Sequence, residues 1–392
     1  MNTKRNIAHG SRGGRRFERH TLLVALLFAA GLLVRFALVF TCRAIPNYSD
    51  MAEYNYLAVE GQFNPHRPPV YPLFLRAIYA LCGTYNYTAV FVVQSLISSA
   101  GVLLMYWSVS RMWNRRAALI AAALYAVYPG LIIYNLTTLT ESLSVFIVVA
   151  MMAVAASRWN DGRTAIVQAV AAGIGMLIKP AFLFFVPGLL VTIRRRVTFL
   201  VVLVCICAPW ILYNAVHSHR LILVSDTGAL NFYMSYNPEA KGGFVQIPDW
   251  ENVSQREYFR MGLDFIRQHK LRAVEIIHTK IYALFELGWD RGVMRDVVGG
   301  EGRAHVVMYA YLAVFVFGFL GLARSSRKAH ASVVAPVVSY VVLTMLLSIF
   351  VVRFRALVEP LLIAYTAILF GGAASRGSEP ISSAKPKAPR RA

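Results

Sequence analysis

Five charged side chains interrupt otherwise apolar stretches of the chain. Glu141 opens one such stretch in LTTLTESLSVF, Lys179 closes another, and Arg353, Arg355 and Glu359 cluster in VVRFRALVEPLLIAY. Ionisable groups are costly inside or beside long apolar runs, so a paired or functional role is their default interpretation. Cations in this setting suit the phosphate of a membrane lipid, because its charge needs fixed positive partners.

Carboxylates come from the polar segment 42–86. Asp50 and Glu53 would share one face of a helix if DMAEYNYLAV is helical. After a break at Gly61, Arg67 opens the run RPPVYP, whose prolines predict an extended or turn-like stretch before the apolar 70–81, which we expect at the membrane interface. A carboxylate such as Asp50 suits the removal of a proton from a hydroxyl nucleophile. Acid and cations together favour displacement of a phosphate by a hydroxyl.

Simpler roles remain open for each of these residues. They are a solvated loop acid for Asp50, a salt bridge for Glu53, a headgroup anchor for Arg67, snorkelling for Lys179, helix capping for Glu141, and interfacial anchoring beside Glu359 for Arg353 and Arg355.

The elements that must position these groups are membrane helices. The chain has 392 residues, of which 57% are apolar, and its mean hydropathy is +0.54. A soluble domain of this length could not bury so much apolar surface. Apolar runs near the roughly 20 residues that cross hydrocarbon recur along the chain. They predict spans at 21–41, 87–110, 117–134, 138–157, 164–179, 181–193, 197–214, 305–322, 331–352 and 356–373.

The net charge of +21 follows this topology. With the N-terminus inside, the predicted cytoplasmic pieces hold 22 Lys and Arg residues against three acids, whereas the outer loop 215–304 is balanced. This is the pattern of the positive-inside rule, and it argues against binding of nucleic acid. We therefore predict a multi-pass protein of the cell inner membrane, with both termini in the cytoplasm and the site residues near the extracytoplasmic surface.

The predicted organisation has five parts. They are a basic cytoplasmic tail (1–20), a transmembrane core (21–214) that includes the outer loop 42–86, an extracytoplasmic cap (215–304), the last transmembrane helices (305–373) and a disordered basic tail (374–392).

Other chemistry finds little support in the sequence. The chain has no P-loop, no Rossmann glycine fingerprint and no metal spacing among its Cys and His residues, so we expect neither metal nor cofactor. His66 is interpreted as a lone loop histidine. Cys42 and Cys82 both fall in the first outer segment, where an oxidising compartment would allow a disulfide between them.

Four segments resemble the membrane-embedded C-type glycosyltransferases, in particular the bacterial family related to protein O-mannosyltransferases and the lipid A aminoarabinose transferase. They are YSDMAEYNYLAVEGQFNPHRPPVYPLFL, GMLIKPAFLFFVPGLL, TGALNFYMSYNPEAKGGF and RFRALVEPLLIAY, spread between residues 22 and 373 in the family's order. The family's first motif often carries two adjacent acids, whereas Met51 follows Asp50 here. We also expect no soluble C-terminal domain, which some members of the family have.

The resemblance implies an all-α polytopic fold, a GT-C-like bundle of about 10–11 transmembrane helices with an interfacial first outer loop and an extracytoplasmic cap. It implies transfer of a sugar from a polyprenyl-phosphate-linked donor to a glycan, lipid or protein acceptor. Asp50 matches the proposed catalytic base of the family; the basic-Pro-Pro-x-Tyr run places Arg67 and Tyr71 at the substrate, and Lys179 matches the basic residue at the carrier phosphate. Substrate contacts are expected from Glu53, Glu141, Arg353, Arg355 and Glu359.

Two other classes of protein remain as alternatives. A flippase or transporter of lipid-linked sugars would need polar residues through the bilayer midplane and an internal repeat, which we do not find. A membrane scaffold without enzymatic activity would have no evident use for acids and bases gathered at one edge.

Overall fold

The computed structural model describes residues 4–41, 49–157, 159–285, 301–325 and 330–372. Within these ranges the chain is helical and contains no β-strand, which confirms the predicted all-α class. The possible pairing of Cys42 with Cys82 and the predicted disorder of 374–392 lie outside the described residues. The bundle is built from α1 (Lys4–Thr41), α4 (Tyr87–Met112), α5 (Arg115–Val127), α6 (Pro129–Ile132), η1 (Ile133–Leu136), α7 (Glu141–Ala155), α8 (Asp161–Ile178), η2 (Pro180–Phe185), α9 (Val186–Thr192), α10 (Arg196–His217), α15 (Glu301–Arg324), α16 (Ala331–Leu347), η6 (Val352–Leu357) and α17 (Glu359–Phe370).

Each of the ten predicted spans coincides with one of these helices or with two or three in succession. By length and hydropathy, four described helices are able to cross a membrane, within α1, α4, α10 and α15. The pair formed by α5 and Pro129–Leu136, bent by 49°, would be a fifth. Shorter apolar helices, including α7, α16 and α17, complete the bundle. That all ten segments cross the bilayer stays a prediction.

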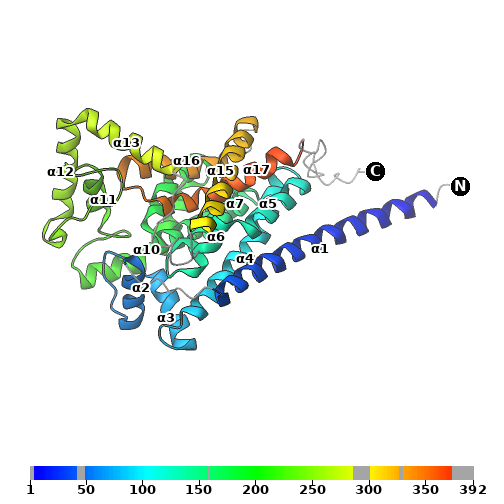
Figure 1. The fold of residues 1–392 in the computed structure, drawn as a ribbon, viewed down its shortest axis with the longest axis horizontal. Helices are drawn as coiled ribbons and strands as arrows, with labels where there is room; N and C mark the ends of the chain where they lie inside the picture. The colour runs from blue at the N-terminus through cyan, green and yellow to red at the C-terminus, as the bar shows by residue number, and fades with distance from the viewer. Residues whose placement is uncertain (1–3, 42–48, 158, 286–300, 326–329, 373–392) are drawn as a thin grey trace, which may run out of the picture.

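The helices pack in a connected order around a common core. In Figure 1, α1 runs along the edge of the bundle and extends beyond it toward the N-terminus. It contacts α4 and α5, while α17 packs between α5 and α15, and α8 packs on α10. Small residues allow this close approach. A side chain at Gly321 would collide with the backbone of Tyr365 in α17, where a Cβ would lie 2.1 Å from its carbonyl oxygen.

The first outer segment folds as two helices, α2 (Asp50–Glu60) and α3 (Val70–Cys82), which pack on each other. The stretch DMAEYNYLAV is helical, which is the condition for Asp50 and Glu53 to share one face, and the predicted break at Gly61 is confirmed. Gly61 ends α2 with φ 71°, a left-handed conformation that glycine adopts without steric cost, and its N–H donates to the Leu57 carbonyl. The turn after Gly61 brings Arg67 back toward the start of α2.

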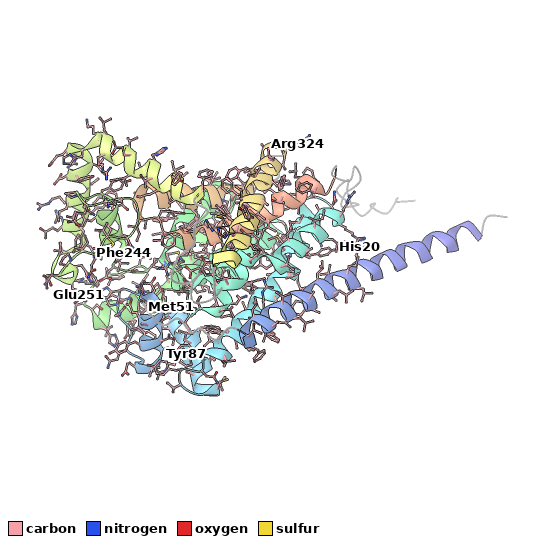
Figure 2. All side chains as sticks on the ribbon, viewed as in Figure 1. His20, Met51, Tyr87, Phe244, Glu251 and Arg324 are labelled. Atoms are coloured by element: carbon pink, nitrogen blue, oxygen red, sulfur yellow. The ribbon has the colours of Figure 1, made fainter. Side chains whose placement is uncertain are left out.

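The predicted outer loop 215–304 is helical in its described part, which we call the cap. Its helices are α11 (Gly228–Ser235), η3 (Trp250–Asn252), α12 (Gln255–Gln268) and α13 (Lys270–Phe285). In Figure 1 they lie at the end of the molecule opposite the N-terminus. Figure 2 places the labelled residues of the predicted outer side, Met51, Phe244 and Glu251, toward this same end, and the predicted inner residues His20 and Arg324 away from it.

Two buried cations that the sequence analysis did not single out hold helix ends in place. Arg35, in α1, donates to the Ala126 carbonyl at 2.7 Å and to Ser98 Oγ at 3.2 Å. It thereby satisfies backbone groups near the end of α5, where the chain breaks before Pro129. Lys280, in α13, donates to the carbonyls of Met345 at 3.0 Å and Ser348 at 2.8 Å, and so attaches the cap to the end of α16.

Candidate active site

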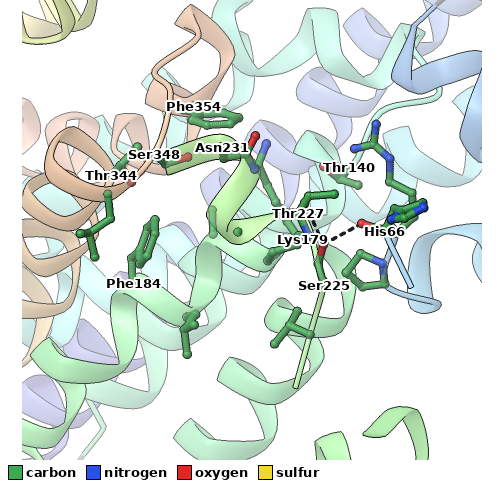
Figure 3. A pocket seen from close by; sticks show the side chains of 18 of the residues that line it. His66, Thr140, Lys179, Phe184, Ser225, Thr227, Asn231, Thr344, Ser348 and Phe354 are labelled. Carbon is green, nitrogen blue, oxygen red and sulfur yellow. Dashed lines mark hydrogen bonds between the residues drawn. The ribbon is translucent and has the colours of Figure 1, made fainter. Parts of the chain in front are cut away.

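A cavity of about 430 Å³ opens where the first outer segment, the α8–η2 junction, the cap and η6 meet. Figure 3 shows it from close by, with Lys179 between His66 and Phe354 in this view. Its lining includes five charged side chains: Asp50, Arg67, Glu141, Lys179 and Arg353. The sequence pointed out all five, although they come from segments up to 303 positions apart.

Asp50 lies between two arginines. Its Oδ1 accepts a hydrogen bond from Arg67 Nη2 at 2.5 Å, and its Oδ2 accepts one from Arg353 Nη2. Arg67 Nε also donates to Glu53 at 2.8 Å, so Asp50 and Glu53 share one helix face, as predicted. Asp50 and Glu53 lie in the first turn of α2, where the helix dipole favours a carboxylate.

The two arginines set the basicity of Asp50. Burial alone would raise the pKa of this carboxyl, but the guanidinium charges of Arg353 and Arg67, together with their hydrogen bonds, outweigh it and hold the pKa well below its ordinary value. In this arrangement Asp50 is ionised and is a weak base. A role in removing a proton requires that at least one arginine leaves it.

A second ion pair lies beside the first. Lys179 Nζ is 2.6 Å from Glu141 Oε1, and Arg353 Nε lies 3.7 Å from the same oxygen. Arg353 therefore connects the two pairs into one network. Glu141 is the first residue of α7, and Lys179 stands in an extended conformation between α8 and Pro180, so both charges sit where helices begin or end. Lys179 also lies over the ring of Phe354, 4.6 Å from its centroid.

Another part of the cavity lining is apolar. It carries Leu183 and Phe184 from η2, Phe232 from α11, Phe259 from α12 and Leu347 from α16. The cavity thus has a charged end and an aromatic end. This is the combination expected for a ligand that has an anionic headgroup and a hydrocarbon chain.

The remaining predicted residues lie elsewhere. Tyr71 is buried behind the cavity, where its hydroxyl donates to Gln94 Oε1 at 3.1 Å. Arg355 and Glu359 pair with each other at 3.4 Å inside the bundle, with Arg355 over the ring of Tyr311. Neither lines the cavity that holds Asp50. The cluster seen in the sequence is therefore divided, with Arg353 on the cavity side.

The interpretation of His66 as a lone loop histidine is incomplete. Its Nδ1 lies 2.6 Å from Asp226 Oδ1, and its ring meets Trp250 edge to face at 4.8 Å. Ser225 and Thr227 line the cavity beside it, and Figure 3 shows the hydrogen bond from Ser225 to the His66 backbone. No local pattern reveals a pair separated by 160 positions.

Part of the chain matches a known family. Residues 66–224 match the family model described as dolichyl-phosphate-mannose-protein mannosyltransferase. The resemblance to protein O-mannosyltransferases is thereby confirmed for this part, which includes Arg67, Glu141 and Lys179. A search of curated protein sequences finds no match.

Several solved structures are similar in overall shape. The oligosaccharyltransferase of Archaeoglobus fulgidus, tethered to an acceptor peptide, is 12% identical over 89% of this chain and 49% of that chain, with a TM-score of 0.49. ArnT from Cupriavidus metallidurans bound to undecaprenyl phosphate is 14% identical over 89% of this chain and 76% of that chain, with a TM-score of 0.42. The chain spans about half the length of the archaeal enzyme.

Proposed function

We propose that the chain is a glycosyltransferase of the inner membrane that transfers a sugar from a polyprenyl-phosphate-linked donor to an envelope acceptor on the extracytoplasmic face. The observation that carries this proposal is Asp50 held between Arg67 and Arg353 in the cavity that also contains Lys179. The family match supports it, because the matched family is described by a sugar donor of this type, dolichyl phosphate mannose.

The proposed reaction is a single displacement at the anomeric carbon. A hydroxyl oxygen of the acceptor forms a bond to that carbon, and the bond from the carbon to the phosphate oxygen breaks with its electron pair leaving on the phosphate. The proton of the hydroxyl passes to Asp50. Arg67, Arg353 and Lys179 stabilise the charge on the departing polyprenyl phosphate. Glu141 holds Lys179, and Glu53 holds Arg67, in place for this role.

Donor binding would prepare the base in the same step. A phosphate that enters the charged end competes with Asp50 for the two guanidinium groups, because both are oxyanions that accept from arginine. Once an arginine moves to the phosphate, Asp50 loses a neighbour that suppresses its basicity. The carboxylate then becomes an effective base when the donor is present, and remains a weak one when the cavity holds no donor.

The aromatic end of the cavity suits the first units of the carrier chain. Phe184, Phe232 and Leu347 present an apolar surface directly beside the charged end. A polyprenyl chain placed there would leave its headgroup among the cations. The charge asymmetry of the loops supports an extracytoplasmic site, since the first outer segment and the cap both fall on the side poor in net positive charge.

The experiment that tests the proposal is reconstitution in proteoliposomes with a panel of labelled polyprenyl-phosphate sugars and an envelope extract as the acceptor. A new glycosidic bond supports the proposal, and its loss in Asp50→Asn at unchanged thermal stability supports the role of Asp50. Relocation of the labelled lipid across the bilayer without a new bond would instead support a transporter. Asp161→Asn is a matched control, because Asp161 is a half-exposed acid of the α8 start, far from the cavity lining.

A further inference from the structure

The corner of the cavity next to His66 is chemically different from the charged end. His66, Ser225 and Thr227, which we call the polar corner, all line the cavity, and none of them takes part in the network of Asp50 and Lys179. Figure 3 shows the three side by side. The proposed function gives the polar corner no role, although its groups are able to bind a ligand.

Asp226 fixes the state of the His66 ring. A carboxylate only accepts hydrogen bonds, so in the neutral ring the proton is on Nδ1, which lies 2.6 Å from Asp226 Oδ1. The other ring nitrogen, Nε2, is then an acceptor, and it has no protein partner within the part of the chain that the structure describes. Asp226 is itself engaged on both oxygens, since Arg220 Nη1 approaches Oδ2 at 3.7 Å.

The polar corner is also held rigidly. The Asp226 N–H donates to the Pro65 carbonyl at 3.1 Å, and Ser225 Oγ donates to the His66 carbonyl at 2.8 Å. The hydroxyls of Ser225 and Thr227 are 2.9 Å apart. Trp250 supports the His66 ring from the edge. Side chains held in this way present their hydrogen-bonding atoms in fixed positions at little entropic cost.

These features match the chemistry of sugar hydroxyls. Ser225 gives its proton to the His66 carbonyl, so Thr227 is the donor in the contact between the two hydroxyls. The polar corner therefore offers acceptors to a ligand, His66 Nε2 and Thr227 Oγ1, and its acid is already paired. A neutral polyol satisfies such a set, whereas an ammonium group would seek a carboxylate and a phosphate would seek a cation. The charged end lies directly beside it, where Arg67 follows His66 in the chain.

We propose that the polar corner is a subsite in which His66 and Thr227 accept hydrogen bonds from the hydroxyl groups of a neutral sugar, with Asp226 and Ser225 as the residues that position them. This inference rests on the proposed function, because it takes the charged end as the site of the carrier phosphate. The hydroxyls come either from the donor sugar or from a sugar of the acceptor. Both have the same chemistry, and the experiment separates them.

The test compares the binding of undecaprenyl phosphate with that of undecaprenyl phosphates carrying mannose, glucose or galactose. In the unmodified protein at least one of the three sugars should strengthen binding over the bare carrier. In His66→Leu this sugar increment should fall about tenfold, which is about 1.4 kcal/mol, while the affinity for bare undecaprenyl phosphate should remain unchanged. Asp226→Asn should reduce the increment as well, and His66→Gln, which keeps an acceptor, should restore part of it. His278→Leu is the matched control, because His278 is an exposed histidine of α13.

A second arm measures the binding of methyl mannoside, glucoside and galactoside to protein saturated with undecaprenyl phosphate. If His66→Leu weakens this binding and leaves the donor increment intact, the subsite takes the acceptor sugar. The proposal is overturned if neither measurement depends on His66, or if no sugar strengthens binding in the unmodified protein. Failure of the proposed function would look different, because undecaprenyl phosphate itself would then not bind or no glycoside would form.

Discussion

Replacement of Asp50 by Asn should strengthen the binding of undecaprenyl phosphate while it abolishes sugar transfer. The two effects have one cause, the competition between the carboxylate and the carrier phosphate for Arg67 and Arg353. In the unliganded cavity both guanidinium groups are engaged with Asp50, one of them at 2.5 Å. A phosphate must displace at least one of them, whereas in Asp50→Asn the competing charge is gone.

The structure sets the size of this effect. A hydrogen bond to a charged group contributes about 1.5–3 kcal/mol net, and about 1.4 kcal/mol corresponds to a factor of ten in affinity. Release of one arginine from Asp50 therefore predicts a dissociation constant roughly tenfold to a hundredfold lower in Asp50→Asn. The removal of a negative charge from the phosphate site acts in the same direction.

The assay is titration of undecaprenyl phosphate into purified protein in nanodiscs, followed by calorimetry. Glu53→Gln should give a smaller gain, because the Glu53 carboxylate pairs with Arg67 and not with Arg353 among the described residues, and it is the more exposed acid. Asp161→Asn should give none. If a folded Asp50→Asn protein binds the carrier phosphate as the unmodified protein does, or more weakly, the arginines do not transfer from Asp50 to the phosphate and the reasoning about the base is refuted.

Three further predictions concern buried cations. Lys179→Met should destabilise the protein by about 3–5 kcal/mol, because it leaves the buried Glu141 with only the more distant Arg353, 3.7 Å away, among the described residues. The double change with Glu141→Gln should recover the thermal midpoint but not transfer; recovery of both would remove Lys179 from the reaction. Arg35→Leu should lower stability by about 1–3 kcal/mol through carbonyls left without a donor, with the affinity for undecaprenyl phosphate unchanged in the protein that remains folded; an unchanged midpoint would contradict this. Burial lowers the pKa of Lys280 to about 7. Between about pH 7 and the ordinary pKa of lysine, the unfolded chain therefore binds one more proton than the folded protein. The thermal midpoint of the unmodified protein, measured relative to that of Lys280→Met, should rise with pH above 7 and stay constant below about pH 6. A difference that is constant from pH 6 to 9 would show that Lys280 keeps its charge.

The parts of the site that could be predicted are those with local signals. Asp50 and Glu53 sit three residues apart on a short helix that Gly61 ends, and Arg67 follows before two prolines. Lys179 is marked by the proline after it. Each of these signals depends on a few neighbouring residues, so a short stretch of sequence is enough to recognise it. Only the tertiary structure shows that these residues meet in one cavity. The sequence placed them on the same side of the membrane and gave no closer relation between them.

Arg353 and Arg355 illustrate a limit of reading from the sequence. They are two residues apart and belong to one charged cluster, yet Arg353 contacts Asp50 and Arg355 contacts Glu359 in the bundle. Both lie in the 3-10 helix η6, where residues two positions apart point in very different directions. An α-helix would separate them in a similar way, by about 200°. The sequence does not reveal which of the two faces the cavity.

Contacts between distant segments were missed for a different reason. His66 and Asp226 are 160 positions apart, and Lys280 meets carbonyls at the end of α16, so neither pair leaves a periodic or spaced pattern. Arg35 is another case, although it stands inside an apolar run as Lys179 does. The same criterion of an ionisable group at membrane depth marks it, and its partners are backbone carbonyls rather than an acid.

The charged end of the cavity is assembled from interruptions of helices. Glu141 begins α7, Lys179 separates α8 from η2, and Arg353 follows the extended residues after α16. Each interruption frees backbone N–H and C=O groups, which a membrane protein tolerates only where they are buried in protein or line a cavity. Side chains at such points are not restricted to the directions that a continuous helix allows, so they can point toward a common centre. A cavity at the depth of these helix ends therefore tolerates the interruptions and also accommodates the charged side chains found there. For this reason, charged residues and helix-breaking residues occur together in the sequence.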